Sequence, residues 1–241
     1  MCGRYSLFTP ADELAERFGA DFDGVEPTYN AAPGQELPVI RDETPETVDH
    51  LAWGLVPAWA DDPEESPAPI NARSETVTEK PTFREAYRRR RCLVPVDGFY
   101  EWTETPPDDR PGDGATAGKV PYRVAFEDDR PFALAGVWET WEGRPAQTGL
   151  GDFGAGGDRT RTKRVDSFTV LTTEPNDLVA DLHDRMAVVL PPDEEERWLT
   201  AEDPRDLLEP YPAAEMRAYP VSPRVNDPGN DDPSLVEPAA D

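Results

Sequence analysis

The stretch RCLVPVDGFYEW, residues 91–102, is the longest strand-like segment of this 241-residue chain. Its Val, Phe, Tyr and Trp side chains favour a pleated backbone, so we predict a strand over Cys92–Trp102. Cys92 is expected to be a buried packing residue. Successive side chains of a strand point to opposite faces, which places Glu101 opposite Tyr100 and Trp102. The stretch therefore predicts a core strand that carries one carboxylate near its end.

Blocks of similar composition, bounded by Pro, Gly or Asp, recur on both sides of this strand. They predict strands at Gly3–Phe8, Leu37–Arg41, Val48–Leu55, Tyr122–Phe126, Phe132–Trp141, Phe168–Thr172, Ala187–Leu190 and Arg217–Val221. A helix is predicted over residues 11–19, with Thr9 and Pro10 as its cap and first turn. Further short helices are predicted at Thr82–Arg90, Asn176–Leu182, Asp193–Leu199 and Pro204–Leu208. These elements indicate an α+β fold dominated by antiparallel strands.

The organisation of the chain points to one domain, because no linker separates two apolar regions and no internal repeat occurs. We predict a single β-rich domain over residues 1–223. Three polar, Pro- or Gly-rich connections have the composition of insertions: Asp61–Pro69, Pro106–Gly118 and Glu142–Lys163. Residues 224–241 form an acidic tail rich in Pro and Asn, which we expect to be ordered only in part.

The charge of the chain is strongly acidic, because 24 Lys and Arg stand against 50 Asp and Glu, giving a net charge of −26. Six Trp, seven Tyr and nine Phe are too many for a disordered chain, so we expect a folded core under an acidic surface. Acidic residues occur in every segment. This favours a surface adapted to high salt, as in a halophilic archaeon, over an ordinary acidic protein.

Composition also excludes several classes of protein. No stretch approaches the roughly 18 uncharged apolar residues of a membrane span. Two cysteines do not make a disulfide scaffold, and two scattered histidines, His50 and His183, lack the ligand spacing of a zinc site. We therefore expect no metal and no cofactor. The N-terminus lacks the basic start and apolar run of a signal peptide, which predicts a cytoplasmic protein.

Cys2 becomes the first residue of the chain if Met1 is removed, which a small second residue permits. It then carries a thiol and an α-amine with a pKa of roughly 7.7–8.0, so a useful fraction of the amine is neutral. The amine can condense with an aldehyde to an imine, onto which the thiol closes a five-membered thiazolidine ring. Alternatively, the thiol is the nucleophile and the amine its base. The remaining interpretation is that Cys2 is simply a small buried residue and that Met1 is retained.

Three further polar residues are candidates for proton transfer or positioning. Glu101, among large aromatic side chains, would have a raised pKa suited to acid–base chemistry, unless it is the solvent-side residue of an amphipathic strand. His183 follows an apolar stretch and could transfer protons near pH 7, or simply cap a helix or fill a core position. Asn71, in INARSE, could orient a substrate or an amine by hydrogen bonding, although most loop asparagines cap or turn.

Basic residues are scarce, so their positions are informative. Arg4, Arg73 and Arg185 each lie two residues from one of the polar candidates Cys2, Asn71 and His183. Arginines gathered at one site of so acidic a surface predict an anionic ligand, plausibly phosphate. The denser runs Arg88–Arg91 and Arg159–Arg164 carry less weight, because the first complements a helix C-terminus and the second lies in an insertion.

An ordered set of short blocks resembles the SOS-response-associated peptidase (SRAP) family. The blocks are MCGRY at residues 1–5, YNAAPG at 29–34, WGLVPAW at 53–59, INARSE at 70–75, RCLVPVDGFYEW at 91–102, FTVLTTE followed by HDRM at 183–186, and NDPGNDDPSLVEP in the tail. Any one block is weak evidence, but the ordered set is highly specific. It extends from the first residue into the tail.

The resemblance implies a single pseudo-barrel-like domain that binds single-stranded DNA and crosslinks itself to abasic sites. Mature Cys2 would attack the ring-opened sugar aldehyde and end as a thiazolidine, and removal of Met1 would account for the name peptidase. The family pattern assigns catalytic roles to Cys2, Asn71, Glu101 and His183. It assigns DNA contacts to Arg4, Asn30, Pro33, Trp59, Arg73, Thr172 and Arg185. We also expect a lyase-type activity, a monomeric protein and association with the nucleoid.

Two features depart from the family pattern. Ala187 follows HDRM where the family has Pro, and the insertion Glu142–Lys163 is long enough to border a DNA channel. The net charge of −26 opposes binding by phosphate neutralisation, a contribution that is small in molar salt anyway. We therefore expect covalent capture and base stacking to carry more of the retention of DNA.

Three other functions remain open from the residues alone. An N-terminal-nucleophile glutamine amidotransferase also begins Met-Cys-Gly, but the Asn-Gly pair expected of that class is absent. A noncatalytic single-strand DNA-binding module would leave Cys2 inert. A protease acting on other proteins would need a specificity pocket that the sequence does not reveal.

Overall fold

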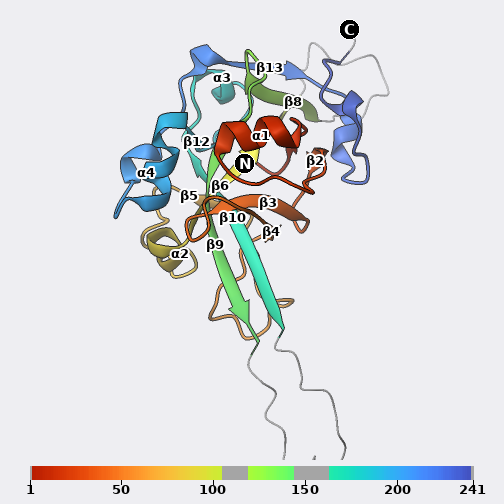
Figure 1. Cartoon of the computed structure of the whole chain (residues 1–241). Coiled ribbons are helices and arrows are strands. Elements are labelled where there is room, and N and C mark those ends of the chain that lie inside the picture. Colours follow the sequence, from red (N-terminus) through yellow and green to blue (C-terminus); the bar gives the residue numbers. More distant parts are fainter. Residues whose placement is uncertain (1, 105–118, 144–162, 240–241) are drawn as a thin grey trace, which may run out of the picture.

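A computed structural model describes residues 2–104, 119–143 and 163–239 of the chain. Two sheets make up the fold (Figure 1). The predicted insertion Pro106–Gly118, and all of Glu142–Lys163 except its ends, lie outside the described residues. Among the residues described, no helix is long and apolar enough to cross a membrane.

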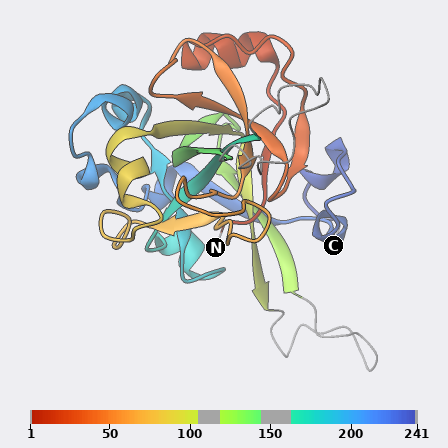
Figure 2. The ribbon, with the colours of Figure 1, turned by 90° about the horizontal axis from the view of Figure 1, so that it is seen from below.

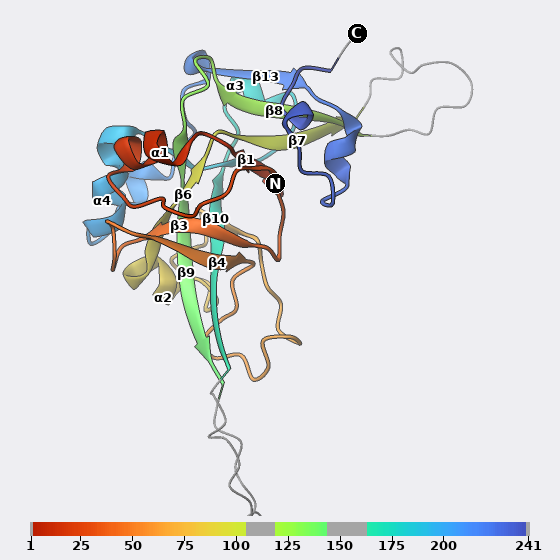
Figure 3. The same cartoon turned by 45° about the vertical axis from the view of Figure 1, so that its right-hand side comes forward.

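The smaller sheet has five antiparallel strands in the order β13-β8-β7-β1-β2. Their bounds are Tyr5–Leu7 for β1, Thr28–Ala31 for β2, Gly98–Glu104 for β7, Lys119–Phe126 for β8 and Met216–Pro220 for β13. In Figure 3, β7, β8 and β13 cross the top of the molecule. Because β1 begins three residues after Cys2, this sheet fixes the start of the described chain.

The larger sheet runs β11-β10-β4-β3-β6-β9-β12, and β9 also pairs with β10. The pairings β10-β4-β3-β6-β9 therefore return to β10 and form a closed ring, as the expected pseudo-barrel requires. Its strands are β3 (Glu36–Arg41), β4 (Val48–Trp53), β5 (Asn71–Arg73), β6 (Arg91–Val96), β9 (Phe132–Glu142), β10 (Arg164–Thr173), β11 (Met186–Ala187) and β12 (Val189–Leu190). Strands β4 and β5 run parallel to β10, whereas the other pairs are antiparallel.

Short helices lie around the strands (Figure 2). The α-helices are α1 (Ala11–Phe18), α2 (Arg84–Arg89), α3 (Asp177–Ala180) and α4 (Glu195–Thr200). Single 3₁₀ turns occupy Pro192–Glu194, Arg205–Leu207, Ala213–Glu215, Pro223–Asn226 and Pro233–Leu235. The predicted α+β class with mostly antiparallel strands is confirmed. The helix predicted at Pro204–Leu208 is a 3₁₀ turn, and only the second part of Asp193–Leu199 is α-helical.

The prediction of one strand over Cys92–Trp102 is wrong, because the stretch divides between the two sheets at Asp97. The buried Asp97 carboxylate accepts hydrogen bonds from the backbone N–H of Phe8, from the N–H of Thr9 at 3.0 Å and from the Thr9 hydroxyl at 2.5 Å. This also corrects the predicted helix cap. Pro10 is the N-cap of α1, and the Thr9 side chain bonds Asp97 instead.

Two short strands were not predicted, β2 and β5. Their sequences, TYNA and NAR, are too short and polar to show an apolar alternation. Tertiary pairing with β1 and β10 makes them strands.

The C-terminal segment differs from the partly ordered tail expected from its composition. Residues 223–239 fold back over the small sheet, with Val225 and Leu235 fully buried against Tyr100. The Asp231 carboxylate accepts hydrogen bonds from the backbone N–H groups of Tyr29 and Asn30 in β2, at 2.5 and 3.1 Å. A few buried apolar side chains and these specific hydrogen bonds order a segment whose overall composition is polar.

Gly136 is required where β9 passes between β6 and β10. A Cβ atom added there would lie 2.8 Å from Cys92 Sγ and 3.0 Å from Val94 Cγ2. We expect Gly136→Ala to lower the free energy of unfolding by about 1–3 kcal/mol through overpacking. Cys92→Ala in the same chain should recover part of this loss, because it removes the nearest atom.

Urea unfolding of wild type, both single variants and the double variant at fixed KCl checks this coupling. An unchanged unfolding midpoint in Gly136→Ala would contradict the close approach of the strands.

Candidate active site

Cys2 lies in the interior, at the point where the small sheet meets the ring. Its side chain is fully buried, and its Sγ atom lies 3.8 Å from the carbonyl oxygen of Arg4. The Asn71 side-chain amide donates a hydrogen bond of 2.8 Å to the Cys2 carbonyl. Asn71 is the first residue of β5, which pairs with β10 in the ring. The structure thus brings together two of the predicted catalytic residues, 69 positions apart in sequence.

The pairing of β1 with β7 brings Glu101 to the same place. Tyr5 pairs with Phe99, and the Tyr100 N–H donates to the Arg4 carbonyl at 3.0 Å, so Glu101 lies level with the residues preceding Arg4. Glu101 is only 1 % exposed. Burial raises its pKa to about 7, although the positive charge of the chain's N-terminus acts in the opposite direction. The desolvated carboxylate predicted from the flanking aromatics is therefore present.

The Cys2 thiol is held in its protonated form. Burial raises its pKa, and the negative charge of Glu101 adds to the effect. A thiolate is the reactive form of cysteine, so this thiol is a poor first nucleophile. The arrangement favours the α-amine of a mature Cys2 as the group that reacts first.

His183 lies between α3 and β11, and its side chain is about 29 % exposed. Its Nδ1 accepts a hydrogen bond of 3.0 Å from the Arg185 N–H, which assigns the proton of the neutral ring to Nε2. Burial lowers its pKa, and the positive charge of the N-terminus lowers it further. Nδ1 also lies 2.8 Å from an Asp184 oxygen, a contact that needs a protonated ring. The lowered pKa favours the neutral ring, in which Nδ1 accepts the backbone hydrogen bond.

Lys119, which the sequence did not single out, is close enough to act on the charges of Glu101 and His183. Its charge lowers the pKa of both Glu101 and His183, and the charge of Asp184 raises both. Lys119 begins β8, directly after residues the structure does not describe. The one signal in the sequence is the rarity of lysine, since only three occur in the chain.

The three arginines predicted to gather at the site differ in availability. Arg73 is exposed at the end of β5, and Arg4 is half-buried with one N–H donated to the Val225 carbonyl at 3.2 Å. Arg185 is largely buried and forms a bidentate ion pair with Glu75, holding the pKa of that carboxyl at about 2. It also donates to the Thr172 carbonyl at 2.7 Å. Glu75 neutralises its charge in this structure, and a phosphate contact by Arg185 stays a prediction.

The remaining predicted DNA contacts divide into buried and exposed residues. Thr172 and Asn30 are 1 % exposed. The Asn30 amide nitrogen donates to the carbonyls of Val225, Asp227 and Asn230 and thereby holds the C-terminal segment in place. Direct DNA contact by either side chain is therefore not supported. Pro33 is exposed, and Trp59 is 64 % exposed.

The C-terminal segment also supports a residue that sequence reasoning missed. The Trp102 indole N–H donates to the Asn226 side-chain oxygen at 2.7 Å. Trp102 follows Glu101 directly, so the segment supports the strand that carries the buried carboxylate. No group of three His, Cys, Asp or Glu suited to a metal ion occurs among the described residues.

Comparison with known proteins gives one consistent result. The family model described as SOS response associated peptidase (SRAP) matches residues 1–228. The abasic site processing protein YoqW of Bacillus subtilis is 38% identical over 250 residues, covering 98% of this chain and 99% of that protein. The abasic site processing protein HMCES of Rattus norvegicus is 28% identical, covering 99% of this chain and 76% of that protein.

Solved structures agree with the sequence comparison. A protein from Bacteroides thetaiotaomicron aligns with a TM-score of 0.76 and 26% identity, covering 99% of this chain and 100% of that one. A protein from Bordetella bronchiseptica aligns with a TM-score of 0.71 and 28% identity, covering 92% and 100%. The matched family model spans nearly the whole chain, and so do the relatives. The chain belongs to the SRAP family.

Proposed function

We propose that this protein captures abasic sites in single-stranded DNA as a covalent thiazolidine on a mature N-terminal Cys2. The observation that carries the proposal is the buried carboxylate of Glu101 beside a Cys2 whose carbonyl is held by Asn71. The names of the relatives, abasic site processing proteins, point to the same class of substrate. Residue 2 is thereby positioned for chemistry at its α-amine.

The first step frees that amine. Hydrolysis of the Met1–Cys2 peptide bond consumes one water and releases methionine. The buried Oδ1 of Asn71 has no hydrogen-bond partner among the described residues, so it is available to accept from the new amine. Asn71 would then hold Cys2 through both its carbonyl and its amine, which fixes the direction of the nitrogen lone pair.

The second step joins the amine to the ring-opened sugar. The amine nitrogen attacks the C1′ aldehyde to give a carbinolamine, which loses water to form an imine. Glu101, with a pKa of about 7, exchanges protons readily at neutral pH: it takes one from the attacking nitrogen and gives one to the departing hydroxyl. The Cys2 thiol then adds to the imine carbon, and its proton moves to the nitrogen. Together, imine formation and thiol addition give C1′ one bond to nitrogen and one bond to sulfur, and they release one water.

His183 and the exposed cations complete the proposal. Opening of the sugar ring moves a proton from the 1′ hydroxyl to O4′, a transfer suited to a neutral imidazole at the edge of the site. Arg4 and Arg73 would bind the flanking phosphates, and Pro33 and Trp59 would stack against bases. The same imidazole would assist reversal of the crosslink through the imine.

Denaturing electrophoresis with an oligonucleotide carrying one abasic site tests the chemistry. Wild type at high KCl should give a slow band without any reductant. Cys2→Ala keeps an α-amine but lacks the thiol, so its band should appear only after borohydride reduction of the imine. Intact DNA and glutamine hydrolysis serve as controls for the noncatalytic DNA-binding and amidotransferase alternatives.

The result that rejects the proposal is the absence of a band from wild type whose intact mass shows that Met1 is gone. A band of equal heat stability from Cys2→Ala without reductant would reject the thiazolidine.

The buried carboxylate makes stability depend on pH. Below about pH 4.5 Glu101 is protonated in both folded and unfolded chains and contributes no pH dependence. Between about pH 4.5 and 7 the unfolded chain loses this proton first, so the folded state is destabilised as the pH rises. Relative to Glu101→Gln, wild type should lose about 3 kcal/mol across this window and then level off.

Urea unfolding of the two proteins at fixed KCl over this pH range measures the difference. A constant difference from pH 4 to pH 8 would contradict the raised pKa.

A further inference from the structure

In the part of the chain that the structure describes, most arginines are paired with a carboxylate. Such pairing is expected where acidic residues outnumber basic ones two to one. Some described cations have no carboxylate of another described residue within 4.0 Å: Arg4, Arg73, Lys80, Arg84, Arg89, Arg91 and Lys119. These unpaired side chains mark where the surface can still accept an anion.

Several of these cations are already explained. Arg91 is buried and donates to main-chain carbonyls, including those of Trp198 at 2.5 Å and Tyr87 at 2.8 Å. Arg4, Arg73 and Lys119 surround the active site. The remaining three, Lys80, Arg84 and Arg89, lie on or just before helix α2. The active site does not account for them.

Helix α2 stands beside Trp59, the large apolar side chain that is most exposed among the described residues. A hollow lies on each side of Trp59, and the two share Pro57, Trp59 and Thr82 in their walls. One, of about 440 Å³, has apolar walls of proline and Phe83 and contains Lys80. The other, of about 400 Å³, contains Arg89. An aromatic ridge between two hollows, each with one cation, is suited to stacked bases with their phosphates alongside.

The carboxylates of the second hollow do not cancel its charge. Glu139 is paired with Arg90 at 2.8 Å, and Glu85 is paired with Arg88 at 3.3 Å. Arg89 alone among the arginines of this hollow has no carboxylate partner among the described residues. Its guanidinium is therefore free to bind a phosphate there.

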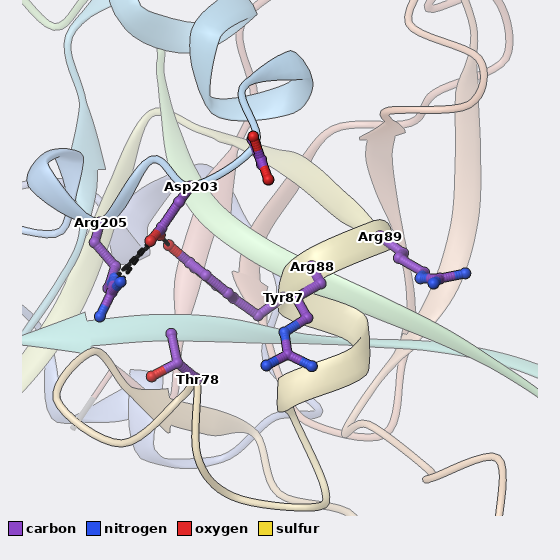
Figure 4. A pocket seen from close by; sticks show the side chains of 7 residues that line it. Thr78, Tyr87, Arg88, Arg89, Asp203 and Arg205 are labelled. Carbon is purple, nitrogen blue, oxygen red and sulfur yellow. Dashed lines mark hydrogen bonds and ion pairs between the residues drawn. The ribbon is translucent and has the colours of Figure 1, made fainter.

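The opposite side of α2 is less suited to an anion. A hollow of about 390 Å³ there also includes Arg89 in its wall (Figure 4). Its other lining residues are Thr78, Tyr87, Arg88, Glu202, Asp203 and Arg205. Arg205 is paired with Asp203 at 2.5 Å, and the Tyr87 hydroxyl donates to the same carboxylate at 3.0 Å. In Figure 4, Arg89 points away from Asp203 and Arg205. The unpaired charge of α2 is thus directed away from the acidic loop.

The ridge is connected to the active site through the main chain. The Pro69 carbonyl, in the wall of the apolar hollow, accepts from the Leu55 N–H at 3.1 Å, and Asn71 follows two residues later. From Arg73, turn hydrogen bonds lead to Lys80: the Thr76 N–H donates to the Arg73 carbonyl, and the Lys80 N–H donates to the Thr76 carbonyl at 3.0 Å. The segment from Pro69 to Lys80 therefore connects the residues of the active site to the start of α2.

We propose that single-stranded DNA continues from the abasic site across Trp59, with one base in each hollow and with Lys80 and Arg89 bound to the adjacent phosphates. This inference rests on the proposed function and adds two phosphate-binding residues to it. It also gives the direction in which the DNA leaves the active site, toward Lys80 and the side of α2 that carries Arg89.

Binding of three abasic oligonucleotides separates this inference from the chemistry. One is short, one is extended on the 5′ side and one on the 3′ side. Fluorescence anisotropy at several KCl concentrations should show that one extension, and only one, raises the affinity. Lys80→Gln and Arg89→Gln should each remove part of that gain and lower the salt slope by about 0.7. Trp59→Ala should lower the affinity for the extended oligonucleotide by about fivefold or more.

Arg205→Gln is the matched control, because it removes an arginine from the other side of α2 that is already paired. It should leave the gain unchanged. Crosslinking of the short oligonucleotide at saturation should also be unchanged in Lys80→Gln and Arg89→Gln, since neither residue touches Cys2.

Failure of the two proposals would look different. If wild type crosslinks the short oligonucleotide but neither extension raises affinity, the path across Trp59 is wrong and the ridge serves another occupant, such as a protein. A gain that Lys80→Gln and Arg89→Gln leave intact would also overturn it. Absence of any crosslink in wild type would instead reject the proposed function.

Discussion

The buried carboxylate of Asp97 is the constraint on which the rest of the structure depends. It binds the N–H groups of Phe8 and Thr9 at the point where the chain leaves the ring and enters the small sheet. The N-terminal segment is thereby tied to the junction of β6 and β7. Because β1 must then pair with the start of β7, the residues that precede Arg4 are brought level with Glu101. One carboxylate with a structural role thus positions another, Glu101, for which we propose a chemical role.

The basic residues of the described chain differ in whether a carboxylate neutralises them. Most described cations neutralise neighbouring carboxylates, and even Arg185, close to the active site, is occupied by Glu75. Among the described residues, the exposed cations without a carboxylate partner are few, and Lys80, Arg84 and Arg89 among them lie on or just before α2. At high ionic strength phosphate neutralisation contributes little, so under the proposed function stacking and a covalent bond would have to retain the DNA. The buried site of Cys2 and Glu101 is where we propose that the covalent bond forms.

Much of this could be read from the sequence, and the failures have physical causes. The pattern of predicted strands indicated the α+β class, and the ordered sequence blocks indicated the family. The division of residues 91–102 was missed because the apolar pattern continues across Asp97, and only the tertiary bonds of its carboxylate reveal the break. The DNA contacts expected of Asn30 and Thr172 stay predictions, and the structure adds that both side chains are buried. A resemblance in sequence does not distinguish a residue that binds a ligand from one that holds the site together. Lys119 lay outside every motif.

The central claim is that the α-amine and thiol of residue 2, and no other nucleophile, hold the sugar. Tandem mass spectrometry of a trypsin-digested crosslink tests it most directly. The account predicts a modified peptide Cys2-Gly3-Arg4 without Met1, carrying the sugar remnant with the loss of one water. A remnant on Lys119 or another lysine, or on a chain that keeps Met1, would contradict it.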